Sequence, residues 1–164
     1  MFYRIERAGP GWLATMHRPE GGDRLAGELA ALRAAGAGVL VCALTEAEAV
    51  HLDLTAERPL AEAAGLEFVP APISDLGLPD AEPYGRVVRL VADRLAAGSG
   101  VVCHCYAGIG RSSMLAAGAL VLEGVEPDDA WARISTARGL QVPDLPAQRE
   151  WLAAWAARRR NVMG

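Results

Sequence analysis

The sequence has 164 residues, a length that fits one domain with a substantial buried core. Apolar residues make up 52% of the chain and charged residues 22%, proportions that exclude an intrinsically disordered protein. The net charge of -4 excludes the broad basic surface by which proteins bind nucleic acid.

The first half of the chain alternates between strand and helix patterns. The run Gly38–Leu44 is continuously apolar, as in a strand buried on both faces of a sheet. Thr45 stands three residues before Glu48, a capping-box spacing that begins a helix. In this half, strands are predicted at 2–6, 11–16, 38–44 and 65–73, and helices at 23–35 and 45–54.

The second half continues this alternation. Apolar residues of 80–97 recur on one helical face, which predicts a surface helix packed on the sheet. Residues 98–105 form a strand, 111–123 a buried helix, and two further helices begin at Pro127 and Pro146. The order predicts one α/β domain over residues 1–164, with a mostly parallel central sheet flanked by helices.

The N-terminus lacks the charged, apolar and cleavage segments of a secretory signal. No apolar run approaches the roughly 18 to 20 residues of a membrane helix. Three cysteines are an odd number and do not build a disulfide framework. We therefore expect a cytoplasmic protein with no membrane partner.

The main functional signal follows the strand that ends in Val-Val-Cys-His-Cys. Five residues separate Cys105 from Arg111: Tyr106, Ala107, Gly108, Ile109 and Gly110. A loop of this length before a helix can turn backbone N–H groups inward as an anion nest, and Gly108 and Gly110 permit unusual backbone angles. Arg111 supplies a planar fork for two phosphate oxygens. The same positive potential stabilises a thiolate at Cys105.

Three other interpretations of this segment are weaker. Cys103, His104 and Cys105 could be metal ligands, but consecutive strand residues point to opposite faces and no second ligand pair follows, so we expect no metal or other cofactor. A nucleotide-binding Walker loop needs a lysine where this loop has Arg111. A sulfurtransferase loop of the rhodanese kind is one residue shorter and lacks the Arg-Ser ending.

The segment His-Cys-Tyr-Ala-Gly-Ile-Gly-Arg-Ser resembles the signature of the protein tyrosine and dual-specificity phosphatases. Its fixed positions are His104, Cys105, Gly108, Arg111 and Ser112. A looser similarity runs from about Leu40 to Trp155 and is greatest to the small enzymes of the kinase-associated phosphatase type. The resemblance implies a protein tyrosine phosphatase-like fold.

The resemblance also implies roles for these residues. Cys105 attacks phosphorus and forms a phosphocysteine, while Arg111 and the loop residues 106–110 hold the phosphate oxygens. Ser112 donates a hydrogen bond to the cysteine sulfur. His104 points away from the phosphate and supports the loop.

The general acid is expected in the segment Pro-Ile-Ser-Asp-Leu-Gly, about thirty residues before the nucleophile. Asp75 occupies the position of the family's acid loop, whereas Asp80 is better placed to cap the next helix. In tyrosine-specific relatives a glutamine positions the hydrolytic water, and both Gln141 and Gln148 are available here. Arg138 is either a substrate contact at the rim of the site or, as we favour, a partner in a structural ion pair. Arg18 is either a rim residue or, as we favour, an anchor of its own loop.

None of the variable loop positions is lysine, which argues against highly charged phosphoinositide headgroups. The sequence therefore predicts a shallow site for phosphotyrosine, with phosphoserine and phosphothreonine as further substrates on a phosphorylated protein. A phosphatase of small molecules or inositol phosphates is the alternative enzyme. A phosphoprotein-binding pseudophosphatase is the alternative outside enzymes.

A redox role is the last expectation from sequence. A low-pKa thiolate is prone to oxidation, and a nearby thiol can trap the product as a disulfide. Cys42 ends an apolar strand predicted to lie beside the strand before Cys105. We expect its sulfur close to that of Cys105, as a resolving partner, while an ordinary buried cysteine is the alternative.

Overall fold

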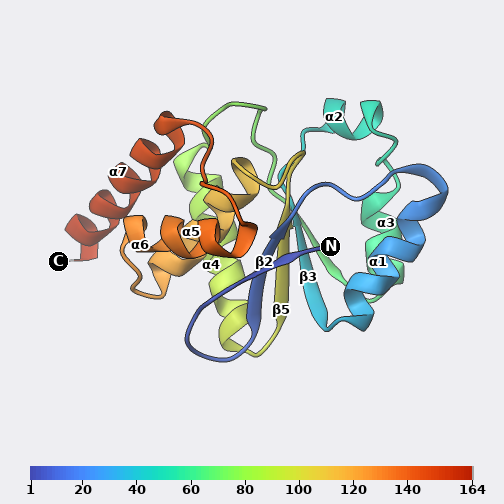
Figure 1. The fold of residues 1–164 in the computed structure, drawn as a ribbon, viewed down its shortest axis with the longest axis horizontal. Coiled ribbons are helices and arrows are strands. Elements are labelled where there is room, and N and C mark those ends of the chain that lie inside the picture. The colour runs from blue at the N-terminus through green and yellow to red at the C-terminus, as the bar shows by residue number, and fades with distance from the viewer. Residues whose placement is uncertain (164) are drawn as a thin grey trace.

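The computed structural model describes residues 1–163, whose backbone forms a five-stranded sheet covered by helices (Figure 1). The strands lie in the order β1-β2-β5-β3-β4, and only β1 runs antiparallel to its neighbour. Their bounds are β1 Tyr3–Ile5, β2 Trp12–Met16, β3 Ala37–Cys42, β4 Glu67–Pro70 and β5 Gly100–His104. The prediction of a single α/β domain with a mostly parallel sheet is confirmed.

The helices form a layer on each face of the sheet (Figure 1). Helices α1 and α3 cover one face, and α4, α5, α6 and α7 cover the other. Their bounds are η1 Gly22–Arg24, α1 Leu25–Ala34, α2 Glu46–His51, α3 Glu57–Ala63, α4 Ala81–Ala96, α5 Arg111–Leu122, α6 Pro127–Arg138 and α7 Pro146–Met163. Within the described chain, no helix has the length and apolar character to cross a membrane.

The central strand β5 leads directly into the loop that follows it. Every residue of β5 is buried, because β2 pairs with one edge and β3 with the other. Leu13 of β2 pairs with Val101, and Val41 of β3 pairs with Cys103. The carboxyl end of β5 therefore lies in the middle of the sheet edge, where open α/β folds bind ligands.

The connection between β3 and β4 differs from the prediction. One helix was expected over 45–54, but α2 ends at His51 and a further helix, α3, runs over Glu57–Ala63. Pro59 lies in the first turn of α3, where its missing N–H costs no helical hydrogen bond. No element was predicted between residues 54 and 65.

Helices α4, α5 and α7 pack together around one tyrosine. The Tyr84 hydroxyl donates a hydrogen bond of 2.7 Å to the carbonyl of Met114 in α5. Trp151 and Trp155 of α7 contact the Tyr84 ring edge-on, at centroid distances of 4.7 and 5.0 Å. A Cβ on Gly118 would lie 2.2 Å from the tyrosine oxygen, so the close approach of α4 to α5 requires glycine there.

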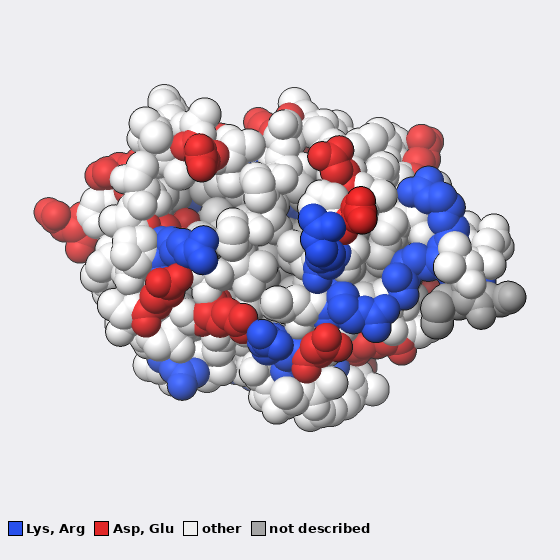
Figure 2. Space-filling model, turned by 180° about the vertical axis from the view of Figure 1, so that it is seen from behind, with Lys and Arg blue, Asp and Glu red and all other residues white. Residues whose placement is uncertain are grey.

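Charged side chains of both signs occur together on the face turned away from the view of Figure 1 (Figure 2). All sixteen basic residues of the chain are arginines, since the sequence contains no lysine. Much of the remaining surface in that view is uncharged (Figure 2).

Candidate active site

The loop between β5 and α5 is shaped by contacts to its carbonyl groups. The backbone N–H of Arg18 donates to the carbonyl of Tyr106 at 3.1 Å. The guanidinium of Arg138 donates to the carbonyls of Ala107 and Gly108 at 3.3 and 3.2 Å. His104 Nδ1 lies 3.2 Å from the carbonyl oxygen of Cys105.

Four consecutive carbonyls of the loop thus point outward to donors outside it. In a trans peptide the N–H points opposite to the C=O, so the next four N–H groups face the inside of the loop. This is the orientation of N–H groups that an anion nest requires. Arg138 thus holds the loop backbone, and it forms no ion pair with the residues that the structure describes.

The two loop glycines differ in backbone angle and in what surrounds them. Gly108 has a φ of 71°, and a Cβ there would lie 2.7 Å from the backbone of Met16. Gly110 has a φ of -95°, so the expectation that it needs an unusual backbone angle is wrong. A Cβ on Gly110 would instead lie 2.7 Å from Asp144 Oδ1 and 2.9 Å from Gln148 Nε2. A side chain at position 110 would therefore have to displace the ends of the Asp144 and Gln148 side chains.

Cys105 follows the last residue of β5 and faces the first turn of α5. Its side chain is almost fully buried, and its Sγ lies 3.2 Å from Ser112 Oγ at hydrogen-bond distance. The structure therefore brings Cys105 and Ser112 together, with the thiol as donor to the hydroxyl.

Arg111 is held in place by a glutamate that sequence reasoning assigned only to a helix cap. Its two terminal nitrogens donate to the two oxygens of Glu48 at 2.7 and 2.9 Å, and Nη1 also donates to the Ile73 carbonyl at 2.9 Å. The Arg111 hydrogen bond lowers the pKa of Glu48. The predicted capping box of Thr45 and Glu48 is present as well, so the Glu48 carboxylate both caps α2 and holds Arg111.

The acid-loop aspartate lies beside the same arginine. Asp75 Oδ1 is 3.3 Å from Arg111 Nη2, and 68% of the Asp75 side chain is exposed. A pocket of about 160 Å³ contains both Asp75 and Cys105. Its lining comprises Asp75, Leu76, Cys105, Tyr106, Ala107, Ile109, Gly110, Arg111, Asp144 and Gln148.

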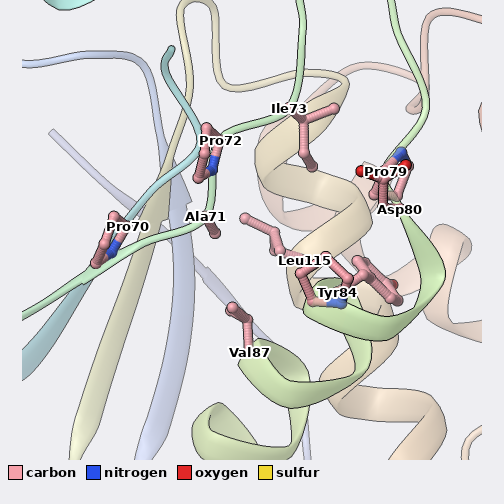
Figure 3. A pocket seen from close by; sticks show the side chains of 10 residues that line it. Pro70, Ala71, Pro72, Ile73, Pro79, Asp80, Tyr84, Val87 and Leu115 are labelled. Atoms are coloured by element: carbon pink, nitrogen blue, oxygen red, sulfur yellow. The ribbon is translucent and has the colours of Figure 1, made fainter. Parts of the chain in front are cut away.

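Asp80 occupies a different place. It is the N-cap residue of α4, as expected, although its side chain makes no capping hydrogen bond. Asp80 lines a second, mainly apolar pocket of about 210 Å³, which extends from Pro70 to Leu115 on α5 (Figure 3). This pocket is lined by no cysteine, and only Pro72 and Ile73 of the acid loop reach it.

The structure separates the two candidate glutamines. Gln148 of α7 is buried, lines the pocket of Cys105, and its Oε1 has no hydrogen-bond partner within residues 1–163. Gln141 is exposed in another surface depression, beside Ser135 and Gly139 of α6. Asp144 reaches the pocket of Cys105 but was not predicted, because no motif distinguishes it from a surface aspartate.

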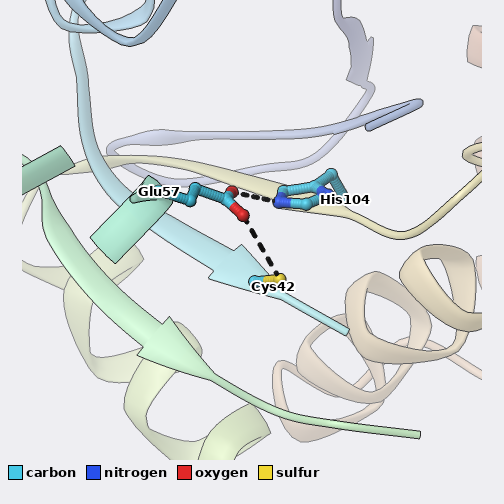
Figure 4. A group of neighbouring side chains, drawn as sticks. All are labelled: Cys42, Glu57 and His104. Atoms are coloured by element: carbon cyan, nitrogen blue, oxygen red, sulfur yellow. Dashed lines mark hydrogen bonds and ion pairs between the residues drawn. The ribbon is translucent and has the colours of Figure 1, made fainter. Parts of the chain in front are cut away.

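His104 and Cys42 belong to a buried group on the other side of β5 (Figure 4). His104 Nε2 is hydrogen-bonded to Glu57 Oε1, and the Cys42 thiol lies 3.7 Å from Glu57 Oε2. Cys103 and Cys105 are not part of this group. Burial raises the pKa of Cys103 to about 12, which makes it an inert thiol.

The expectation that Cys42 faces Cys105 is wrong. In the sheet Cys42 pairs with His104, so these two side chains share one face, while the Cys105 sulfur contacts Ser112 on the other. The two cysteines accordingly belong to the apolar cores on opposite sides of the sheet. A direct disulfide between them would have to cross the sheet.

Comparison with known proteins places this geometry in context. The profile of the family described as "polymorphic toxin system, DSP-PTPase phosphatase" (Tc-R-P) matches residues 14–125. This match includes Glu48, Asp75, Cys105 and Arg111. No curated protein matches the sequence significantly.

Solved structures share the fold at low sequence identity. Kinase associated phosphatase, solved with serine in place of its catalytic-site cysteine, is 18% identical with a TM-score of 0.87, over 96% of this chain and 94% of that chain. PTPMT1 in complex with PI(5)P is 21% identical with a TM-score of 0.78, over 99% of each chain. The active form of Tk-PTP is 22% identical with a TM-score of 0.75, over 95% of this chain and 97% of that chain.

Proposed function

The chain belongs to the DSP-PTPase phosphatase family of polymorphic toxin systems, and from this premise we propose that it hydrolyses phosphomonoesters through a phosphocysteine at Cys105. One observation carries the proposal. One small pocket is lined by the Cys105 thiol, its loop and Arg111. The loop turns N–H groups inward, and Glu48 holds Arg111 through a bidentate pair. That combination binds a tetrahedral dianion and presents a nucleophile to it.

In the first step the Cys105 thiolate attacks phosphorus in line, and the bond between phosphorus and the leaving oxygen breaks. The loop N–H groups and Arg111 hold the three equatorial oxygens, where charge concentrates. Asp75 lies at the open side of the pocket and donates a proton to the leaving oxygen.

In the second step a water oxygen attacks phosphorus and the sulfur–phosphorus bond breaks. The Asp75 carboxylate accepts a proton from the water, and the Ser112 hydroxyl donates a hydrogen bond to the departing sulfur. Gln148, with an unpartnered amide oxygen beside Gly110, orients the water. Gln141 has no part in this scheme.

The rim of the pocket supports an aryl phosphate as substrate. Leu76 and Tyr106 are large side chains, 65% and 50% exposed, and both line the pocket. The Arg18 guanidinium lies 5.4 Å from the centroid of the Tyr106 ring and supports it from behind. Asp75 and Asp144 at the same rim repel additional phosphates. We therefore propose phosphotyrosine as the preferred substrate, with phosphoserine and phosphothreonine as slower ones.

The nucleophile is tested by Cys105→Ser. The variant should lose turnover of nitrophenyl phosphate, because a hydroxyl at this position is not ionised, yet should still bind vanadate. Turnover near the wild-type rate would exclude the phosphocysteine scheme. A chelator should leave the wild-type rate unchanged, since no step uses a metal.

The substrate class is tested with matched phosphopeptides and inositol phosphates. Phosphotyrosine peptides should have the highest kcat/KM, and Leu76→Ala should lower it more for phosphotyrosine than for phosphoserine. A preference for inositol phosphates would support the small-molecule alternative instead. Binding of phosphopeptides without turnover would identify a pseudophosphatase.

A further inference from the structure

Glu57 is a buried carboxylate that the proposed reaction does not use. Only 2% of Glu57 and none of His104 is exposed, although 47 residues separate them in sequence. Glu57 opens α3, and His104 ends β5, next to the nucleophile. Figure 4 shows the carboxylate between the imidazole and the Cys42 thiol, with one oxygen toward each.

Hydrogen bonding in this group determines the charge of the histidine. His104 Nδ1 faces the Cys105 carbonyl oxygen, and Nε2 faces a Glu57 carboxylate oxygen. When Glu57 is a carboxylate, both partners are acceptors, so both ring nitrogens carry protons and the ring is an imidazolium. The other Glu57 oxygen accepts from the Cys42 thiol, and the positive and negative charges balance inside the protein.

The pKa of His104 is consistent with this geometry. Burial alone lowers it, but hydrogen bonds with Cys42 and Glu57 raise the pKa of His104 well above its ordinary value. The other titratable group in contact with the ring is the Cys42 thiol, on the neighbouring strand β3.

His104 differs from the other donors that hold the catalytic loop. The carbonyls of Tyr106, Ala107 and Gly108 accept from a backbone N–H or from Arg138, groups that keep their protons at all physiological pH values. The Cys105 carbonyl depends on an imidazole. A neutral imidazole has one N–H for two acceptors and would leave either Cys105 or Glu57 without a partner.

We propose that Glu57 is a positioning residue for the reaction, which holds His104 as an imidazolium and so fixes the first peptide of the catalytic loop. The inference rests on the proposed function. Glu57 touches neither the pocket nor the loop, so its effect passes through His104.

The test is Glu57→Gln, read by the pH dependence of Cys105 alkylation with iodoacetamide. Glutamine keeps the size and a hydrogen bond to a neutral His104, but it removes both charges. The pH of half-maximal alkylation should rise by roughly one unit, because the N–H groups of a loop that is no longer fixed stabilise the thiolate less. Glu67→Gln is the control. It removes a carboxylate of β4 that is paired with Arg94, and it should leave the alkylation profile unchanged.

A double-mutant cycle shows whether Glu57 acts through the histidine. In a His104→Gln background, Glu57→Gln should cause no further shift of the alkylation profile. An equal shift in both backgrounds would overturn the proposal. So would a loss of thermal stability in Glu57→Gln with an unchanged profile, which is the result of a purely structural role.

Two measurements on the wild-type protein do not depend on how the variants fold. Nitrogen-15 NMR of labelled histidine should show both His104 ring nitrogens protonated at pH 8, assigned with His104→Gln, and a neutral tautomer would overturn the proposal. Metal analysis should find no stoichiometric metal, whereas one bound equivalent that Glu57→Gln abolishes would make the group a metal site. Wild-type turnover of nitrophenyl phosphate tests the proposed function separately, because alkylation requires no activity.

Discussion

Asp75 and Asp80 are five residues apart, yet the structure gives them different surroundings. Asp75 lies 3.3 Å from Arg111 in the pocket of the nucleophile, whereas Asp80 begins α4 and lines the neighbouring apolar pocket. The positions support a chemical role for Asp75 alone. Substrates that differ in leaving group can separate the two residues.

Asp75→Asn should slow an alkyl phosphate roughly a hundred- to ten-thousand-fold, because the alkoxide needs a proton. The loss should be much smaller for nitrophenyl phosphate, whose leaving group is stable as an anion. Asp80→Asn is the matched control and should show no dependence on the leaving group. The comparison of kcat for both substrates checks the assignment, and a reversed pattern would transfer the acid role to Asp80.

Glu48→Gln should lower kcat/KM for nitrophenyl phosphate by roughly 10- to 100-fold, because a misdirected Arg111 no longer holds the phosphate oxygens in line. The helix cap should survive, since glutamine can also accept from Thr45. Glu46 lies exposed on the same helix, so Glu46→Gln should behave as wild type. Steady-state kinetics of both variants measure the effect, and equal kcat/KM in both would show that Glu48 is not required to orient Arg111.

At the scale of whole elements, the contact of α4 with α5 depends on Tyr84 and Gly118. Gly118→Ala should destabilise the protein by about 1–3 kcal/mol, because the new methyl group would meet the tyrosine oxygen. Removing that oxygen in Tyr84→Phe should cost about 1 kcal/mol alone, yet make Gly118→Ala less costly. Urea unfolding of the two single variants and the double variant measures the coupling.

Gly27 offers a control for that cycle. It lies in α1, and a Cβ there would meet nothing within 4 Å. Gly27→Ala should therefore stabilise the protein by roughly 0.5–1 kcal/mol through helix propensity. Loss of stability in Gly27→Ala would contradict this prediction. Crowding around the added methyl group would then not explain a loss of stability in Gly118→Ala.

The order of the elements could be predicted because each main element carries a local pattern. The leucines of α1, the apolar run of β3 and the one-sided face of α4 follow the periods of helix and strand. The loop from Cys105 to Arg111 could be predicted because its chemistry lies in consecutive residues. Its pocket confirms that these residues come together.

The roles of Glu48 and Glu57 could not be predicted, because their partners are distant in sequence. Glu48 lies 63 residues from Arg111, and Glu57 lies 47 from His104. Locally each resembles any glutamate in the first turn of a helix. Cys42 was placed correctly beside β5 but assigned to the wrong face, since the residue it pairs with is His104 and not Cys105.

At the scale of the whole molecule, the pair of Glu57 and His104 ties α3 to β5 and should make stability depend on pH. The folded pKa of His104 is raised above its unfolded value of about 6.5. Its contribution is therefore fully present below pH about 6.5 and is lost as pH rises through the folded value. Urea midpoints should fall on the alkaline side in wild type and fall less in His104→Gln. Parallel curves would contradict this linkage.

The strand order has a consequence for how the chain can fold during synthesis. Strands β2 and β3 are successive in sequence, but β5 lies between them in the sheet. Residues 12–16 therefore cannot complete their strand pairing until residues 100–104 have been synthesised. Such distant pairing is slow to form and cannot be completed by the first half of the chain. The strand that closes the sheet is also the one that carries the nucleophile. A nascent or truncated chain that lacks β5 therefore has neither a complete sheet nor a reactive site, and chemical competence arises only together with the finished fold.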